Sequence, residues 1–221
     1  MHRPSQDFTS ARQWIVDGQV RPNKVYDPRI IAAMRSLPRE LFVPDAQASL
    51  AYADAPVPLG GGRALLEPMV IARMVQTAAA RSGERALVVG AGAGYGAALL
   101  AACGAQVTAL DDDAAVQALA PRALAGIGGV SIVTGPLAAG WKAGAPYDVI
   151  LIEGAANEVP EALVAQLRAP GGRLVAVRPG AGPLGTAVLA EHSGGALSFQ
   201  PVFDCAAPLL AALAREPAFV F

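Results

Sequence analysis

The chain has 221 residues, of which 53% are hydrophobic and 16% charged, and 17 lysines and arginines against 18 aspartates and glutamates leave a formal net charge of −1. This near-neutral balance, with an isoelectric point of about 6.1, argues against nucleic acid as the main partner, because duplex binding usually needs a basic surface. A mean hydropathy of +0.40 excludes an intrinsically disordered chain, and 2 cysteines without CxxC spacing provide no disulfide framework.

The first third of the chain is its more charged, proline-containing part, and we expect residues 1–67 to form an N-terminal extension of helices and loops. Asp27 and Pro28 have the pattern of a helix start, with Asp as the N-cap and Pro at the first helical position. Residues 51–62 are predicted to be a loop because they carry prolines and end in three consecutive glycines. A further helix is predicted over 68–81.

Beyond residue 85, segments with strand character alternate with helical ones. The predicted strands cover residues 86–89, 106–110, 130–133, 147–153, 173–177, 185–191 and 197–203, and the predicted helices cover 95–103, about 113–125 and 159–168. This alternation predicts an α/β fold with a doubly wound, mostly parallel sheet. The last two strands, joined by a tight turn at 193–195, predict an antiparallel pair at one edge. We expect residues 68–221 to form this domain and the extension to pack on it as one structural unit.

The longest run without a charged side chain covers residues 86–110 and is long enough to span a bilayer. It contains glycines at alternate positions from 90 to 96, and each costs a helix about 1 kcal/mol relative to alanine. A buried parallel sheet explains the same apolar run better, since its strands are covered on both faces. The N-terminal residues lack the apolar core of a signal peptide, so we expect a cytoplasmic protein without membrane contact.

The sharpest local signal is the sequence GAGAGY at residues 90–95, which follows a predicted strand and opens a predicted helix. Asp111 ends the next predicted strand, where a carboxylate can accept the ribose hydroxyls of a nucleoside. The glycine spacing differs from the G-x-G-x-x-G of dinucleotide sites, which favours S-adenosylmethionine over a nicotinamide cofactor. Two alternatives stay open: the loop is a tight turn that binds nothing, and the acidic run 111–113 only caps the following helix.

Over roughly residues 12–178 the chain resembles the protein-L-isoaspartate O-methyltransferases. The matching segments are LPRELFVP (37–44), AYADAPVPLG (51–60), GAGAGY (90–95), GW (140–141), APYD (145–148), AA (155–156), VPEAL (159–163), QL (166–167) and GGRLV (171–175), and the C-terminal stretch 203–221 resembles a tail found in a bacterial subgroup of that family. The resemblance implies a Rossmann-like methyltransferase fold. It also implies methyl transfer from S-adenosylmethionine to the α-carboxyl of isoaspartyl residues in damaged proteins. The partner would be a polypeptide or another carboxylate-bearing substrate, with a monomer as the default state.

The resemblance also implies which residues hold the cofactor. To these we add Glu153, which stands where the family has a small or neutral residue and is expected to face the cleft. The expected cofactor-binding set is Gly90, Ala91, Gly92, Gly94, Tyr95, Asp111, Asp112, Gly135, Leu137 and Glu153. No metal site is expected.

Besides Glu153, four positions depart from the family pattern. Leu66 stands where the family has a hydroxyl beside the methyl-transfer site, and Glu67 replaces the following glutamine, which makes Glu67 the one candidate catalytic residue. Val88 and Pro136 stand where the family has acidic residues that contact the cofactor. An alternative function is therefore a non-catalytic or substrate-shifted binding module with weakened or lost S-adenosylmethionine binding. Glu67 has its own alternative, an exposed carboxylate at a helix start.

Overall fold

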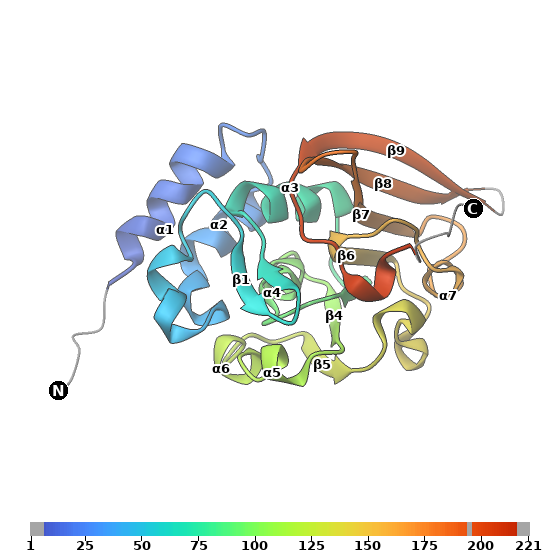
Figure 1. Ribbon diagram of the computed structural model, residues 1–221, viewed down its shortest axis with the longest axis horizontal. Helices are drawn as coiled ribbons and strands as arrows, with labels where there is room; N and C mark the ends of the chain where they lie inside the picture. The colour runs from blue at the N-terminus through green and yellow to red at the C-terminus, as the bar shows by residue number, and fades with distance from the viewer. Residues whose placement is uncertain (1–6, 194–195, 216–221) are drawn as a thin grey trace, which may run out of the picture.

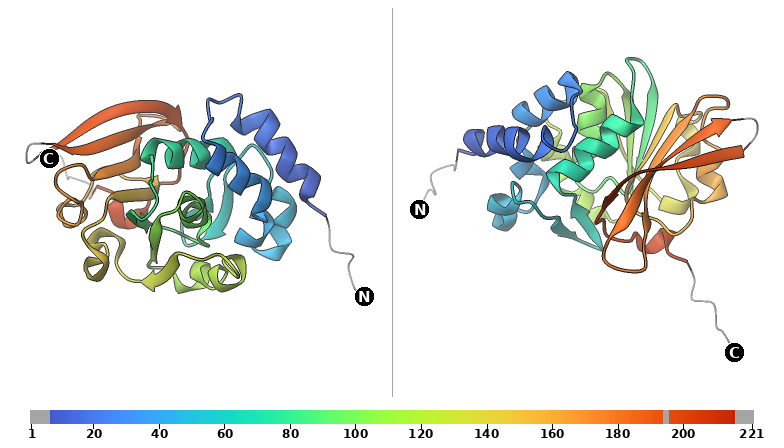
Figure 2. Two further views of the ribbon diagram at one scale, coloured as in Figure 1. Left: turned by 180° about the vertical axis from the view of Figure 1, so that it is seen from behind. Right: turned by 90° about the horizontal axis from the view of Figure 1, so that it is seen from above.

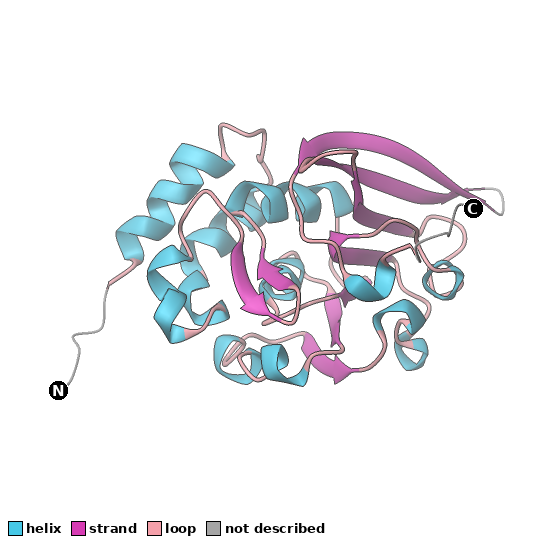
Figure 3. Cartoon of the chain, in the orientation of Figure 1, coloured by secondary structure: helices cyan, strands magenta, loops and turns pink. Residues whose placement is uncertain are grey.

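The computed structural model describes residues 7–193 and 196–215, and a seven-stranded sheet with the order β5-β4-β3-β6-β7-β8-β9 forms its centre (Figures 1 and 3). The strands are β3 (Arg85–Val89), β4 (Gln106–Asp111), β5 (Val130–Thr134), β6 (Val149–Ala155), β7 (Arg173–Pro179), β8 (Gly185–Ser193) and β9 (Ala196–Cys205). Strands β3 to β7 pair in parallel, and β8 and β9 add an antiparallel pair at one edge. The predicted fold class and edge pair are confirmed, although part of the predicted turn at 193–195 lies outside the described residues.

Helices cover both faces of the sheet, and the N-terminal ones gather on one side of it (Figure 2). The α-helices are α1 (Thr9–Ile15), α2 (Pro28–Ser36), α3 (Pro68–Ala78), α4 (Tyr95–Ala102), α5 (Ala114–Gln117), α6 (Ala120–Ala123) and α7 (Glu161–Val164). The π-helix η1 (Val16–Val20) follows α1, and the 3-10 turns are η2 (Arg39–Phe42), η3 (Asp45–Leu50), η4 (Leu137–Ala139), η5 (Lys142–Gly144) and η6 (Ala211–Leu213).

Alternate residues of β6 enter two separate apolar clusters, Val149 and Leu151 on one face and Ile150 and Ile152 on the other. A strand covered on both faces reads as one apolar run. The uncharged run 86–110 is accordingly β3, the glycine loop, α4 and β4. Among the described residues, no helix has the length and apolarity of a membrane span.

One predicted loop is wrong, because residues 51–62 contain the strand β1 (Val57–Gly60). It pairs antiparallel with β2 (Arg63–Leu65) in a separate two-stranded sheet. The chain reverses between them through Gly60, Gly61 and Gly62, which all take positive φ angles of 98°, 54° and 73°. Glycine reaches this region without a steric penalty, so the glycines that indicated a loop form the turn of a hairpin.

Two predicted helices are shorter in the structure. The helix predicted over 113–125 is divided into α5 and α6, and Pro121 stands in the first turn of α6, where its missing N–H interrupts a continuous helix. The helix predicted over 159–168 is α-helical only over α7. Its last residues bond to Tyr147 instead, with the Arg168 N–H donating to the Tyr147 carbonyl at 2.8 Å.

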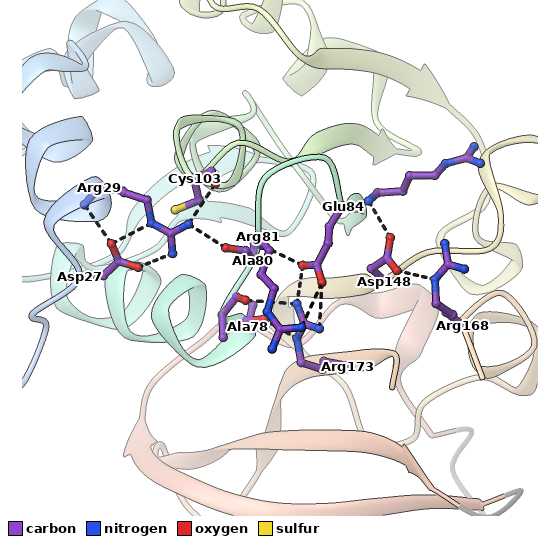
Figure 4. A network of polar contacts seen from close by, with 12 residues as sticks. Asp27, Arg29, Ala78, Ala80, Arg81, Glu84, Cys103, Asp148, Arg168 and Arg173 are labelled. Atoms are coloured by element: carbon purple, nitrogen blue, oxygen red, sulfur yellow. Dashed lines mark hydrogen bonds and ion pairs between the residues drawn. The ribbon is translucent and has the colours of Figure 1, made fainter. Parts of the chain in front are cut away.

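A network of polar contacts fixes the C-terminal end of α3 at the amino ends of the strands (Figure 4). Arg173, the first residue of β7, is 9% exposed, and its Nε donates to the Ala78 carbonyl at 2.8 Å. Its Nη2 donates to Glu84 Oε2 at 2.6 Å and to the Ala79 carbonyl at 3.2 Å. Since these carbonyls end the helix, the arginine satisfies them and holds α3 on the sheet. The N-terminal end of α3 is thereby directed to the opposite, carboxyl edge.

We expect replacement of Arg173 by methionine to lower the free energy of unfolding by about 3 kcal/mol, because it leaves Glu84 and two helix carbonyls without their buried partner. Arg168 provides a matched control: its side chain is 47% exposed and pairs with Asp148, so Arg168→Met should cost under about 1 kcal/mol. Urea unfolding of both variants measures the difference, and equal losses would show that the buried network does not hold α3.

Candidate functional site

The loop between β3 and α4 lies at the carboxyl edge of the sheet and is held to the end of β4. The N–H groups of Gly90 and Ala91 both donate to the Leu110 carbonyl at 3.0 Å. Gly90, Gly92 and Gly94 take positive φ angles of 72°, 56° and 91°. Only glycine adopts such a succession at low cost, so the alternating glycines are what allows the chain to turn from β3 into α4.

Asp111, the last residue of β4, is completely buried and binds three other parts of the chain. Its Oδ2 accepts from the Gly92 N–H at 2.8 Å and its Oδ1 accepts from the Asp113 N–H at 3.0 Å. Arg63 of the hairpin places its Nε 3.1 Å and 3.2 Å from the two carboxylate oxygens. The Arg63 guanidinium also pairs with Asp112. In this conformation protein donors therefore take up the carboxylate that was predicted to receive ribose hydroxyls.

The residues of the acidic run 111–113 have different roles. Asp113, and not Asp111, caps α5, because its Oδ1 accepts from the N–H groups of Ala115 and Val116 at 2.9 Å and 3.2 Å. From the sequence, helix capping was an alternative role for the whole run 111–113. In the structure only its last residue caps the helix, and the Asp111 carboxylate binds the glycine loop instead.

The crevice between β3 and β6 is the point at which the strand order reverses, where open α/β sheets usually bind ligands. Leu210 packs beside it, is completely buried, and belongs to the apolar cluster on one face of the sheet. A Cβ atom on Gly90 would lie 2.9 Å from Leu210 Cδ1, and one on Gly154 would lie 2.7 Å from Leu210 Cγ. The segment that carries Leu210 is bonded to β6, since the Leu210 N–H donates to the Ala155 carbonyl at 3.0 Å and the Ala155 N–H to the Pro208 carbonyl at 2.8 Å.

The residues of this edge have the chemistry for an adenosyl ligand, and an open cavity of about 390 Å³ lies beside them, lined by Arg63 of the hairpin and by Ala206, Ala207 and Pro208. The glycine loop and Asp111 provide the close backbone approach and the acceptor that such a ligand needs. Arg63 pairs with this acceptor, and Leu210 packs against Gly90 and Gly154. The sequence reading missed both residues, and the only signal for Leu210 is an apolar stretch that continues after the last predicted strand.

The structure separates the other expected cofactor residues. Gly135 follows β5 at the same edge, and its N–H donates to the Asp111 carbonyl at 3.0 Å. Asp112 lies there too, through its pair with Arg63. Leu137 of η4 is fully buried in the apolar cluster on one face of the sheet, and Tyr95 is buried in the cluster on the other face.

Glu153 lies in a buried polar cluster with Arg39 and Tyr95 and is only 5% exposed. It packs against α4, where a Cβ atom on Gly96 would lie 2.5 Å from its Oε2. The Arg39 guanidinium carbon is 4.7 Å from the centre of the Tyr95 ring. Among the described residues, Arg39 Nη1, the Tyr95 hydroxyl and Glu153 Oε2 have no hydrogen-bond partner. Burial raises the pKa of Glu153 to about 8, although the charge of Arg39 opposes this.

Glu67 stands at the N-cap of α3 but forms no side-chain cap, and it is half-buried. Burial raises its pKa, and a hydrogen bond with Asp54 together with that residue's charge raises it further. Leu66 is 1% exposed and belongs to the apolar core, and its carbonyl accepts from Arg39. The polar group that the N-terminal end of α3 presents is therefore the Glu67 carboxyl.

The raised pKa of Glu153 makes stability depend on pH. The native carboxyl keeps its proton up to about pH 8, whereas the unfolded one, with its ordinary pKa, loses it near pH 4.5. Between these values the native state binds more protons, so the free energy of unfolding should fall as pH rises. Glu153→Gln should remove this fall, as measured by urea unfolding from about pH 5 to about pH 9. The control Glu158→Gln, at a carboxyl that is 72% exposed, should retain it; an unchanged slope in Glu153→Gln would contradict the assignment.

Comparison with known proteins identifies the family of this chain. Residues 12–183 match the family described as "Protein-L-isoaspartate(D-aspartate) O-methyltransferase (PCMT)". A protein-L-isoaspartate O-methyltransferase of Methylorubrum extorquens is 45% identical over 78% of this chain and 75% of its own length. One of Koribacter versatilis is 36% identical over 96% of both chains.

Solved structures show the same fold. A protein-L-isoaspartate O-methyltransferase covers 93% of this chain and 67% of its own, with a TM-score of 0.77 and 24% identity. A Plasmodium falciparum protein described as a member of the same class, solved with S-adenosyl-L-homocysteine, covers 94% of this chain and 100% of its own, with a TM-score of 0.74 and 19% identity.

Proposed function

Because the chain belongs to the protein-L-isoaspartate O-methyltransferase family, we propose that it is an S-adenosylmethionine-dependent enzyme that methylates the carboxyl group of isoaspartyl residues in polypeptides. Repair of damaged proteins in the cytoplasm is the role that accompanies this activity and forms part of the proposal. The family match over residues 12–183 covers both the hairpin and the glycine loop. The non-catalytic alternative has no support from these relatives, which are named as enzymes.

The observation that carries the proposal is the bond between the glycine loop and Asp111 at the carboxyl edge. The Gly92 N–H donates to the Asp111 carboxylate across the ends of two adjacent parallel strands. We propose that Gly90, Ala91, Gly92 and Gly94 approach the cofactor through their backbone and that Asp111 holds its ribose. Asp112 and Gly135 lie at the same edge and complete this set. For Tyr95, Leu137 and Glu153 we propose a supporting role, since all three are buried.

Glu67 is the residue that we propose to face the methyl acceptor. Methyl transfer depends mainly on the position of the two reactants and needs little acid–base chemistry from the protein. An ionised Glu67 beside Asp54 would repel an isoaspartyl carboxylate, whereas a protonated one would donate a hydrogen bond to it. The raised pKa of Glu67 favours the protonated form and reconciles this residue with an anionic substrate.

The activity is tested with labelled S-adenosylmethionine and two peptides that differ only in one isoaspartyl or aspartyl residue. We expect methyl incorporation into the isoaspartyl peptide alone. Asp111→Asn should lower the rate at least about tenfold, because it removes a buried charge from the site. Asp17→Asn, at a side chain that is 51% exposed, is the control that should leave the rate unchanged. Circular dichroism establishes that each variant is folded, and equal labelling of both peptides would refute the proposed substrate.

Glu67 should give the reaction a dependence on pH. As pH rises through the raised pKa of Glu67, the carboxyl ionises and repels the substrate, so the KM for the isoaspartyl peptide should rise by about fivefold. In Glu67→Gln the KM should stay level over the same range, while the surface control Glu161→Gln should behave as the wild type. A KM that rises equally in all three proteins would place Glu67 away from the acceptor.

A further inference from the structure

A groove runs along the outer side of α3, between this helix, the chain around residue 24 and the antiparallel pair β8–β9. Its volume is about 490 Å³, and its lining includes Lys24, Arg73 and Gln76 of α3, and Gln200 and Val202 of β9. Figures 1 and 2 show the pair β8–β9 beside α3. The groove is separate from the cavity beside Arg63, with which it shares no described lining residue.

The groove has a positive charge that the protein does not neutralise. Arg73 and Lys24 both line it, and among the described residues neither forms an ion pair with a carboxylate. The described lining contains no acidic side chain. Asp27, which follows Lys24 closely in the chain, pairs with Arg29 instead. A ligand that complements this groove therefore carries negative charge.

Contacts on both walls of the groove fix the positions of the two cations. The Arg73 guanidinium carbon lies 3.8 Å from the centre of the Phe203 ring, so this cation is held between α3 and β9. On the opposite wall, Gln76 Nε2 donates to the Lys24 carbonyl at 2.9 Å, and its Oε1 accepts from the Tyr26 N–H at 2.8 Å. Lys24 takes a φ of 65°, which residues with a side chain seldom adopt. The groove is therefore a built feature of the fold.

One end of the groove lies close to Glu67. Glu67 is the N-cap of α3, and Arg73 follows it by about 9 Å along the same helix, at about 1.5 Å per residue. Burial raises the pKa of Cys205 at the end of β9 to about 11, while the charge of Arg73 lowers it and that of Glu67 raises it, so both charges lie near this thiol. Since an extended peptide spans about 3.4 Å per residue, about three residues bridge Glu67 and Arg73.

We propose that this groove binds the polypeptide substrate on one side of the isoaspartyl residue and selects an acidic residue about three positions away from it. The inference rests on the proposed function, since it concerns the substrate of the same site. Arg73 receives the acidic side chain, and Lys24 attracts negative charge farther along the groove. The two cations also offset the repulsion that the Glu67 and Asp54 carboxyls exert on an anionic substrate.

Isoaspartyl peptides that differ in one residue test the groove in the unaltered protein. The residue three positions from the isoaspartyl one is aspartate, asparagine or lysine, on its amino side in one set and on its carboxyl side in the other. We expect the KM for methyl transfer to be about threefold lower for aspartate than for asparagine in one of the two sets. The difference should vanish at about 1 M salt, which screens exposed charges. Equal KM values in both sets at low salt would overturn the inference.

Charge reversal assigns the preference to Arg73. In Arg73→Glu the lysine peptide should have a KM about threefold lower than the aspartate peptide, which reverses the order in the wild type. A variant that is only destabilised loses activity on every peptide and acquires no new preference. Arg178→Glu is the matched control, because its guanidinium lies 4.2 Å from the ring centre of Phe199 on the same strand but outside the groove, and it should keep the wild-type order. Retention of that order by Arg73→Glu, or its loss in both variants, would overturn the role of the groove.

The two proposals fail in different ways. Methyl transfer to isoaspartyl peptides without any dependence on the neighbouring charge would overturn the groove and leave the proposed function standing. If none of the isoaspartyl peptides is methylated, the proposed function and the substrate groove are both wrong.

Discussion

The buried carboxylate of Asp111 is the constraint on which the carboxyl edge of this protein depends. A charge with no exposure to solvent requires paired donors, and each donor to Asp111 comes from a different element. Gly92 provides an N–H from the glycine loop, Asp113 provides one from the start of α5, and Arg63 provides its guanidinium from the hairpin. One side chain thereby aligns three segments with the end of β4, and a shift of any one of them removes a partner from a buried charge.

The topology of the sheet creates the second constraint. Where the strand order reverses between β3 and β6, the loops after the two strands diverge and leave a crevice that ligands use in proteins of this class. Glycines at positions 90 and 154 make the crevice wide enough for a side chain, and Leu210 packs against both. Leu210 thereby joins the apolar cluster on one face of the sheet, where burial of its side chain contributes to stability.

The glycine loop and Asp111 could be placed from the sequence because both follow directly from local pattern: a strand, a turn that only glycine can make, and an acid at the next strand end. Glu153 and Tyr95 could not be placed in the same way. Because β6 is buried on both faces, its sequence shows no alternation from which to decide which face Glu153 takes. The structure directs it toward Arg39 and Gly96, into a cluster to which the N-terminal extension contributes Arg39. The hairpin was missed for a related reason, since its glycines equally suit a loop.

The sequence by itself determined the family and, beyond residue 85, the order of strands and helices. It also determined the turn at residues 90–94 and the acid that ends β4, since each of these depends on residues that are neighbours in the chain. Only the tertiary structure decided what those groups contact. Arg63 stands 48 residues from Asp111, and Leu210 lies far beyond the glycine loop that it covers. Contacts between such distant residues follow from how the sheet, the hairpin and the C-terminal segment pack together, and no local pattern encodes them. Which residues contact the glycine loop and Asp111 can therefore be read only from the folded chain.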